Sequence, residues 1–564
     1  MMDKTRKILL AVGAGLMALA LAALIFMNVP TMGEKTFTFH STYEGKEDTL
    51  EASYWQVDGA DYAVLICPGY SCDRQKWRPF ADLFVKNGIT TMVFDYSGQG
   101  ASYGSIGFDN AKTDHVPTQI HDALTELHTR SGIDYDHIIL LGHSMGGRAI
   151  LKMLTVESLD LPVANIILLS PEVDYVYSAQ ASLFAGTLDA EEEPWKSYSE
   201  AYTVGHNIYL FGSTGDDIVS AGSVLGLYRH LGGTLTQEKG AVMPNHVEVN
   251  GVGSRITLGI VKGVLHSYEM YSGKFASLVN GALEEITGVA PSFPAWRIMT
   301  VYFGWLIGLA GIAVLLIGLN RGRAMAAEGV TETLPTLVNA KKFLLWKLFF
   351  WLPGLLAAGI ICCITVVMPF GSPVMNSVYM CAIAGYGLVM LLCYRKGHFA
   401  GTEGKLPKPS FRLHGKTWVV PCLVAVGICA FVVYALRTGM YRLLPLNWRL
   451  FWLVFAGVLM TVGYYVSGCE ADMLRAAHAG PGVTVLYNLI QYVALFLLVA
   501  FYCILKSWSG LIGQVQNMVL MYAFCIPLGN YLRRSTGSRV WGAFITAFVF
   551  QAMMITSAAL IAMF

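Results

Sequence analysis

Gly142-His143-Ser144-Met145-Gly146-Gly147 follows the apolar run Ile138-Ile139-Leu140-Leu141 and precedes a stretch of helical character, Arg148–Leu154. A strand that turns at once into a helix brings the backbone too close for a Cβ atom, so glycines are needed two residues either side of the serine. Such a turn holds the Ser144 hydroxyl in a strained but accessible position. The helix that follows directs its N-terminus at the reacting centre, where free N–H groups favour negative charge on a substrate carbonyl. The segment therefore predicts a nucleophilic serine.

A second stretch fits the same G-x-S-x-G pattern, Gly100-Ala101-Ser102-Tyr103-Gly104. A chain with 58 glycines produces this pattern by chance at an appreciable rate. The second stretch has no apolar strand directly before it and no helical period after it. We therefore expect Ser144 rather than Ser102 to react, and the alternative for Ser144 is an ordinary serine in a glycine-rich turn.

The composition divides the chain into two modules. Hydrophobic residues make up 54% and charged residues 14% of the sequence, whereas soluble proteins typically contain about 25% charged residues. Residues 31–295 have a mixed composition, but residues 299–564 are dominated by apolar runs long enough to cross a bilayer, which needs about 20 residues. The net charge is +1 and no Lys/Arg cluster alternates with aromatic residues, so nucleic acid is not an expected partner.

The N-terminal segment reads as an uncleaved membrane anchor within residues 1–30. Lys4, Arg6 and Lys7 precede an apolar stretch from Ile8 to Val29, which exceeds a secretory h-region of about 7–15 residues and lacks a small-x-small cleavage site. Eight further spans make residues 296–564 an all-α polytopic transmembrane domain, with spans near 299–319, 348–369, 375–394, 418–436, 450–468, 484–505, 511–531 and 541–563. Nine spans place the two termini on opposite sides.

The basic residues of the loops predict the orientation. With the N-terminus in the cytoplasm, the inner loops receive Arg321, Arg323, Lys341, Lys342, Arg395, Lys396, Lys405, Lys408, Lys416, Arg475, Arg533, Arg534 and Arg539, and the outer loops only Arg437, Arg442, Arg449 and Lys506. The opposite orientation would put the basic loop 395–416 outside. We therefore expect a multi-pass protein of the cell membrane whose residues 31–295 are extracytoplasmic.

Strands and helices alternate through residues 31–295. The expected strands are Tyr62–Cys67, Ile89–Asp95, His137–Leu141, Ala164–Leu169, Asn207–Phe211 and a strand near Arg255–Val261; the expected helices are Lys76–Lys86, Thr118–Thr129, one after Ser144, Ser220–His230 and Lys274–Ile286. This alternation predicts an α/β fold with a doubly wound, mostly parallel sheet. An irregular acidic stretch around Asp189–Pro194 indicates a cap over about residues 174–205.

At this point the chain resembles the α/β-hydrolase superfamily, most closely its lipase, esterase and serine aminopeptidase branches, over about residues 40–288. The resemblance is carried by Cys67-Pro68-Gly69-Tyr70, by Phe94-Asp95-Tyr96-Ser97-Gly98-Gln99-Gly100-Ala101-Ser102, which looks like the family's D-x-x-G-x-G-x-S loop, and by the turn at Gly142–Gly147. It implies that the backbone N–H groups of Tyr70 and Met145 form an oxyanion hole. Relatives commonly have His-Gly where this chain has Pro68-Gly69.

A serine nucleophile needs a histidine to take its proton and a carboxylate to orient that histidine. In this fold their order along the chain is serine, acid, histidine. The expected strand Asn207–Phe211 leads into Gly212-Ser213-Thr214-Gly215-Asp216-Asp217, where we favour Asp216 as the acid. Asp217 and Asp174 remain open, and any of them could instead form a turn or cap a helix.

Two histidines compete for the role of the base. His246 lies at the more usual distance from Asp216, in a segment flanked by glycines, whereas His266 follows the apolar run Ile256–Val264 directly before the final amphipathic helix. The catalytic histidine must descend from the loop after the last strand, so we favour His266 and expect His246 on an inserted hairpin. His143, beside the nucleophile, is expected to contribute packing.

The remaining cysteines and polar residues give few further expectations. Cys67 and Cys72 could form a disulfide outside the cell, but two cysteines five positions apart at the end of a strand often cannot reach the geometry that a disulfide requires. The chain contains no zinc-ligand spacing and no phosphate-binding glycine loop, so we expect neither metal nor cofactor. In the helical module, we expect scattered Asn and Gln side chains to form contacts between helices. Glu470, Asp472 and Arg475 are expected to form a solvated cluster at the membrane interface.

These expectations combine into a hypothesis about function. Ser144 attacks the carbonyl of an ester, thioester or amide, His266 accepts and returns the proton, and Asp216 orients His266. The substrate could be lipid-linked, with membrane lipid as the other partner. Two alternatives stay open: a membrane acyltransferase, and a transporter, channel or sensor whose hydrolase-like domain binds or processes a ligand. The sequence does not identify the substrate.

Overall fold

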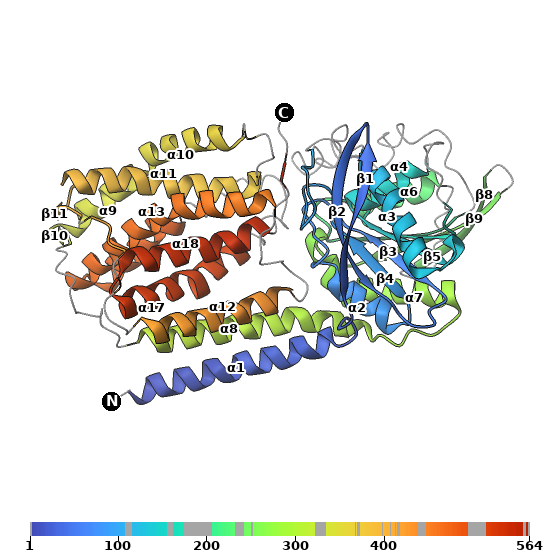
Figure 1. Cartoon of the computed structure of the whole chain (residues 1–564), viewed down its shortest axis with the longest axis horizontal. Coiled ribbons are helices and arrows are strands. Elements are labelled where there is room, and N and C mark those ends of the chain that lie inside the picture. The colour runs from blue at the N-terminus through green and yellow to red at the C-terminus, as the bar shows by residue number, and fades with distance from the viewer. Residues whose placement is uncertain are drawn as a thin grey trace.

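The computed structural model describes residues 3–107, 115–154, 162–173, 206–231, 242–249, 252–321, 334–366, 368, 373–397, 399–406, 408–411, 413, 418–437, 447–493, 515–556 and 560–561. An α/β domain lies at one end of a bundle of helices that run roughly side by side (Figure 1). The expected cap at 174–205, which includes Asp174, lies outside the described residues, as do parts of the expected spans 484–505 and 511–531.

The α/β domain is built on a nine-stranded sheet in the order β1-β2-β4-β3-β5-β6-β7-β9-β8. The strands are β1 Lys35–Tyr43, β2 Lys46–Trp55, β3 Ala63–Cys67, β4 Thr90–Phe94, β5 Ile138–His143, β6 Asn165–Leu169, β7 Asn207–Ser213, β8 Val242–Val249 and β9 Val252–Val261. The contiguous strands from β4 to β9 pair in parallel, while β1–β2, β2–β4 and β8–β9 are antiparallel. The expected α/β class with a mostly parallel sheet is confirmed.

Helices cover both faces of this sheet. They are α2 Arg78–Lys86, α3 His115–Ser131, α4 Met145–Met153, α6 Ala221–His230 and α7 Gly273–Thr287. Successive strand residues point to opposite faces, so Ile139 and Leu141 pack in one cluster with α2 and α7, while Ile138 and Leu140 pack in another with α3, α4 and α6. Strands buried on both faces are typical of parallel sheets, which explains their unbroken apolar runs.

Two antiparallel hairpins extend the sheet at its edges, and only the first, β1 and β2, was not expected from the sequence. The hairpin of β1 and β2 turns at Glu44 and Gly45, both with positive φ (+49° and +79°), which is the geometry of a two-residue hairpin turn. At the other edge, β8 pairs with β9, and His246 lies on β8 opposite Arg255. His246 thus belongs to an edge hairpin, as expected for the less favoured base.

The helical module contains α1 Lys4–Asn28, α8 Thr300–Asn320, α9 Ala340–Phe349, α10 Trp351–Val366, α11 Val374–Lys396, α12 Val419–Arg437, α13 Trp448–Ala476, α14 Pro481–Asn488, α17 Ile526–Thr536 and α18 Arg539–Thr556. Within the described residues, four helical stretches are long and apolar enough to cross a membrane: Lys4–Asn28, Ala295–Asn320, Ala340–Thr365 and Trp448–Ala476. Beyond the end of α18, Ile561 pairs with Ile106 of the α/β domain, so the expected last span, 541–563, is too long.

Helices α1 and α8 pack against each other through glycines. A Cβ atom on Gly13 would lie 2.6 Å from the backbone N of Leu315, and one on Gly311 would lie 2.9 Å from that of Met17. Small residues let helix backbones approach this closely, which is a common way of joining helices in membranes. Asp3 and Arg321 form an ion pair (3.0 Å) where the two helices end, at the end of the bundle far from the α/β domain (Figure 1).

The acidic cluster of α13 is buried, contrary to the expectation of a solvated interface. Glu470 accepts hydrogen bonds from Lys347 Nζ (2.6 Å), Tyr394 Oη (2.9 Å) and Tyr487 Oη (3.0 Å). Asp472 is paired with Arg533 (2.7 Å) and Arg539 (3.1 Å). The expected span 450–468 therefore ended too early, because α13 keeps these carboxylates inside the bundle by supplying each with cationic partners from other helices.

Candidate active site

Ser144 occupies the sharp turn between β5 and α4. Its backbone has φ +52° and ψ −117°, a sparsely populated region that costs of order 1–3 kcal/mol and persists where the surroundings impose it. The neighbouring glycines are required: a Cβ atom on Gly142 would lie 2.8 Å from the Cα of Gly147, and one on Gly146 would lie 2.2 Å from the carbonyl oxygen of Cys67. The geometry is that of a nucleophile elbow.

Ser102, the other serine in a G-x-S-x-G pattern, has a structural role. Its hydroxyl donates to the backbone carbonyl of Asp95 and accepts from the backbone N–H of Glu51 at 2.9 Å. Both hydrogen-bonding functions of the hydroxyl are thus used within the fold. The hydroxyl of Ser144, by contrast, makes no hydrogen bond among the residues that the structure describes.

Asp216 and His266 are brought together from two loops at the carboxyl edge of the sheet. Nδ1 of His266 lies 2.8 Å from Oδ2 of Asp216, and the other carboxylate oxygen accepts the backbone N–H groups of Ile218 and Val219, both at 2.8 Å. These two N–H bonds fix the carboxylate in the turn after β7. His266 begins the short 3-10 helix His266–Tyr271 that follows β9.

The pKa of His266 reflects two opposing effects. Burial by itself lowers the pKa, but the charge of Asp216 and its hydrogen bond outweigh that effect, so the net pKa lies above the ordinary value of 6.5. Asp216, rather than Asp217, holds the hydrogen bond to the ring. An imidazole held this way has one tautomer fixed and its other nitrogen, Nε2, available for proton transfer.

The imidazole of His266 lies beside the elbow. Its ring stacks on that of His143, with centroids 4.7 Å apart and an interplanar angle of 29°. His143 is buried and also contacts Trp77 (5.2 Å between centroids), so it has the packing role expected. No hydrogen bond joins His266 to Ser144 within the described part of the chain; such bonds are often long before substrate binds.

The loop after β3 passes directly over the serine. A Cβ atom on Gly69 would lie 3.0 Å from the Cβ of Ser144 and 2.7 Å from Nδ1 of His143. Tyr70 follows at once, and Met145 is the first residue of α4, so both proposed oxyanion donors belong to segments that flank Ser144. Cys67 and Cys72 are buried free thiols rather than a disulfide.

A second carboxyl group, missed by the sequence analysis, lies behind the Asp216–His266 pair. Glu269 is completely buried, accepts a hydrogen bond from the Ser170 hydroxyl (2.6 Å), and lies 3.4 Å from Nε2 of His143. Burial, reinforced by the nearby charge of Asp216, raises the pKa of Glu269 well above 4.5. The available signal was an acidic residue three positions after the candidate base in a segment next to the core.

His143, His266 and Glu269 each present a possible metal ligand, and these atoms lie within 4.8 Å of one another. Burial lowers the pKa of His143 well below 6.5, which leaves its ring neutral. Nδ1 of His266 is already bonded to Asp216, and burial together with the charge of Asp216 raises the pKa of Glu269 and so favours its protonated form. The cluster is therefore better suited to holding protons than to binding a cation.

Comparison with known proteins finds a family model that matches part of the α/β domain. Residues 58–192, which include β3 to β6, match the profile of the serine aminopeptidase S33 family of hydrolases. One similar solved structure is an esterase of Pyrococcus furiosus, with 16% identity and a TM-score of 0.32 over 45% of this chain and 90% of that chain. Another is a putative hydrolase of Agrobacterium vitis, with 16% identity and a TM-score of 0.32 over 45% of this chain and 98% of that chain. A soluble variant of the monoglyceride lipase of Saccharomyces cerevisiae is also similar, with 13% identity and a TM-score of 0.31 over 44% of this chain and 94% of that chain. A comparison with curated protein sequences finds no match.

The family match and the sheet topology together give this domain an α/β-hydrolase fold. The chain thus combines a domain of hydrolase fold with a helical module.

Proposed function

We propose that the protein is a membrane-bound serine hydrolase whose nucleophile is Ser144. The observation that carries the proposal is a strained serine at the elbow, next to a histidine that a hydrogen bond of 2.8 Å joins to a carboxylate. Asp216 and His266 come from different loops, and this arrangement has the chain order and roles of a hydrolase triad.

In the proposed mechanism, Oγ of Ser144 attacks the substrate carbonyl carbon while Nε2 of His266 takes the hydroxyl proton. The resulting oxyanion is stabilised by the N–H groups of Tyr70 and Met145. His266 then gives its proton to the leaving alcohol, thiol or amine, the carbonyl re-forms, and the acyl group stays on Ser144. Water attacks the acyl-enzyme, again with proton transfer through His266, which releases the acid and restores the serine.

We further propose that the hydrolase domain lies on the outer face of the cell membrane and acts on a lipid-linked acyl ester. The apolar stretches Lys4–Asn28 and Ala295–Asn320 support membrane attachment on both sides of the domain in the sequence. The carboxyl edge of the sheet is turned towards the bundle: Tyr268 and Tyr271, which follow His266, contact Tyr302 of α8 with ring centroids 6.1 Å and 6.0 Å apart. A site next to membrane helices favours a substrate that arrives from the bilayer.

Labelling with a fluorophosphonate tests the nucleophile. We expect the purified full chain to be labelled at Ser144, the label to disappear in Ser144→Ala, and the labelling rate to fall sharply in His266→Ala. His246→Ala and Asp217→Asn are the matched controls, since neither residue has a role in the proposed reaction. Persistent labelling of Ser144→Ala, or loss of labelling in His246→Ala alone, would show that another pair of residues reacts.

Substrate preference tests the bond type. We expect p-nitrophenyl esters of long acyl chains in mixed micelles to be cleaved faster than short esters and faster than a series of aminoacyl amides. Preference for the amides would instead assign a peptidase. Formation of a new ester when an alcohol is added, faster than release of free acid, would assign acyl transfer.

A further inference from the structure

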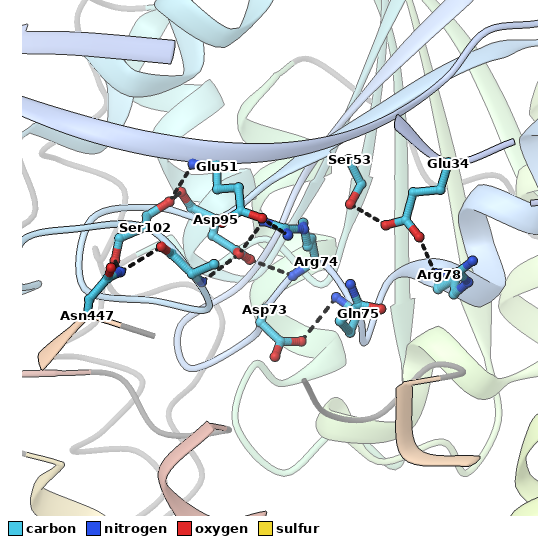
Figure 2. A network of polar contacts seen from close by, with 11 residues as sticks. Glu34, Glu51, Ser53, Asp73, Arg74, Gln75, Arg78, Asp95, Ser102 and Asn447 are labelled. Atoms are coloured by element: carbon cyan, nitrogen blue, oxygen red, sulfur yellow. Dashed lines mark hydrogen bonds and ion pairs between the residues drawn. The ribbon is translucent and has the colours of Figure 1, made fainter. Parts of the chain in front are cut away.

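The loop that follows β4 connects the active site with the helical module. We define the β3 loop as residues 68–77, which include Gly69 and Tyr70, and the β4 loop as residues 95–106. Figure 2 shows that side chains from both loops, from β2 and from the start of α13 meet in one polar network. This network leads from the bundle to the β3 loop, whose Gly69 lies next to Ser144.

The β3 loop is fixed by the β4 loop. Asp95 accepts the backbone N–H of Arg74 at 2.7 Å and pairs with its guanidinium at 3.0 Å, and Gln99 Oε1 accepts the backbone N–H of Cys72 at 3.0 Å. Arg74 is buried and is also paired with Glu51 on β2 (Figure 2). Burial makes these bonds costly to break, because a buried polar group that loses its partner cannot bond to water instead.

The β4 loop is compact, and its backbone approaches the Asp95 carboxylate so closely that position 100 requires a glycine. A Cβ atom on Gly100, which has φ +47°, would lie 2.1 Å from the carboxylate of Asp95. That carboxylate also accepts the backbone N–H of Ala101 at 2.9 Å. The loop therefore wraps tightly round Asp95, and its outward-facing carbonyl groups need donors from elsewhere.

Those donors come from the helical module. Asn447 Nδ2 donates to the carbonyl groups of Ala101 (2.7 Å) and Ser102 (3.3 Å), and Arg449 donates to the carbonyl of Gly98 at 2.6 Å. The backbone N–H of Leu560 donates to the same Gly98 carbonyl at 2.8 Å. Asn447 has φ +60°, a strained value for a residue with a side chain, at the point where α13 begins.

We propose that Asn447 and Arg449 are positioning residues of the hydrolase site. They hold the β4 loop, the β4 loop holds the β3 loop, and the β3 loop sets the height of Gly69 and Tyr70 above Ser144. This inference rests on the proposed role of Ser144 and goes beyond it, because it makes the helical module part of the catalytic apparatus. A shift of about 1 Å at the oxyanion donors can lower the rate about 100-fold, so small changes in this support should be measurable.

The test uses the full chain with a soluble short acyl ester as substrate. In Asn447→Asp, a carboxylate faces two carbonyl oxygens where a donor stood; in Arg449→Met the donor to Gly98 is lost, and Arg449→Lys restores a donor. Leu450→Ala is the matched control, because this side chain lies on the same turn of α13 and is exposed. We expect kcat to fall about 10-fold or more in Asn447→Asp and Arg449→Met with KM within about 2-fold, Arg449→Lys to recover part of kcat, and Leu450→Ala to match the wild type.

Hydrogen exchange gives a readout that does not depend on activity. We expect the backbone N–H groups of Cys72, Arg74 and Ala101 to exchange faster in Asn447→Asp and Arg449→Met than in the wild type, while those of α7 stay protected. If folded variants keep wild-type kcat and wild-type exchange, or if only KM changes, the positioning role is wrong. If the wild type itself is not labelled at Ser144, the proposed hydrolase mechanism fails, and exchange then reports separately on whether α13 supports the β3 loop.

Discussion

A buried carboxyl group with a raised pKa lies behind the Asp216–His266 pair. Glu269 has Ser170 as its hydrogen-bond donor, and its raised pKa follows from burial and from the charge of Asp216. A neutral Glu269 avoids placing a second negative charge beside the first. The Asp216 carboxylate can then direct its charge at the imidazole, which is what stabilises the imidazolium formed during proton transfer.

Substitution distinguishes a neutral from a charged Glu269. We expect Glu269→Gln, a neutral mimic of the protonated acid, to stay within about 1 kcal/mol of the wild type in free energy of unfolding. Glu269→Ala removes the acceptor of the buried Ser170 hydroxyl and should lower this free energy by about 1–3 kcal/mol. Denaturant unfolding in detergent measures both; equal losses in the two variants would contradict a protonated Glu269.

The same group predicts how stability varies with pH. A carboxyl whose pKa is raised in the folded protein adds stability that is fully present below its unfolded pKa and is lost as pH rises towards the folded value. The unfolded pKa of Glu269 is about 4.3, so the wild type should lose stability relative to Glu269→Gln as the pH rises above about 4. Parallel unfolding curves for the two proteins across this range would show that the pKa is not raised.

The raised pKa of His266 predicts the pH profile of the reaction. His266 must be neutral to accept the proton from Ser144, so kcat/KM should rise with pH along a limb whose apparent pKa lies above 6.5. Asp216→Asn should lower kcat by about 10⁴-fold because the tautomer is no longer fixed. Asp217→Asn should leave kcat almost unchanged, because Asp217 does not hold the hydrogen bond to His266, and a large loss of kcat in this control would move the acid role to Asp217.

At the scale of elements, the sequence predicted the features that depend only on neighbouring residues, such as the turn around Ser144. The strand, the glycines and the helix around Ser144 lie within one short stretch, so the elbow can be read directly. The partners of Glu269 and Arg449 are Ser170 and Gly98, which lie far away in the chain, and no local pattern reports such pairs. The hairpin of β1 and β2 was missed for a different reason: it extends the sheet in antiparallel fashion before the alternation of strands and helices begins.

Helix packing yields a prediction at this scale. Gly311 of α8 faces the backbone of α1, with a potential Cβ atom 2.9 Å from N of Met17, whereas nothing lies within 4 Å of a Cβ on Gly427 of α12. We expect Gly311→Leu to force α1 away from α8 and to destabilise the protein by about 1–3 kcal/mol. Gly427→Leu is the control and should be tolerated. Thermal unfolding in detergent compares them, and equal midpoints would mean that α1 does not pack on α8 as described.

At the scale of the whole molecule, the residues of α13 that contact the β4 loop and the ion pair of Asp3 with Arg321 lie at opposite ends of the bundle (Figure 1). The distribution of Lys and Arg among the loops predicted that the end of the bundle with the N-terminus is cytoplasmic. The sequence could not predict that the carboxyl edge of the sheet faces the other end, because this orientation depends on contacts such as those of Tyr302 and Asn447 with loops of the α/β domain.

Membrane-impermeant maleimides test the orientation. Asp58 and Lys405 are both exposed, the first in the α/β domain and the second beside β11 (Thr402–Glu403). We expect a cysteine at position 58, made by Asp58→Cys, to be labelled in intact cells, and Lys405→Cys to be labelled only after the cells are lysed. The reverse pattern would place the hydrolase domain in the cytoplasm.

The bond between Leu560 and Gly98 also bears on how the protein is made. The Gly98 carbonyl belongs to a segment that leaves the ribosome early, but its donor at position 560 is synthesised only after every helix up to Thr556. Until then the β4 loop lacks the hydrogen bond from Leu560, and Ile106 lacks its pairing with Ile561. In a nascent chain, Ser144 is therefore synthesised long before the contacts that hold the β4 loop are complete, and these contacts can form only after residues 560 and 561 have been made.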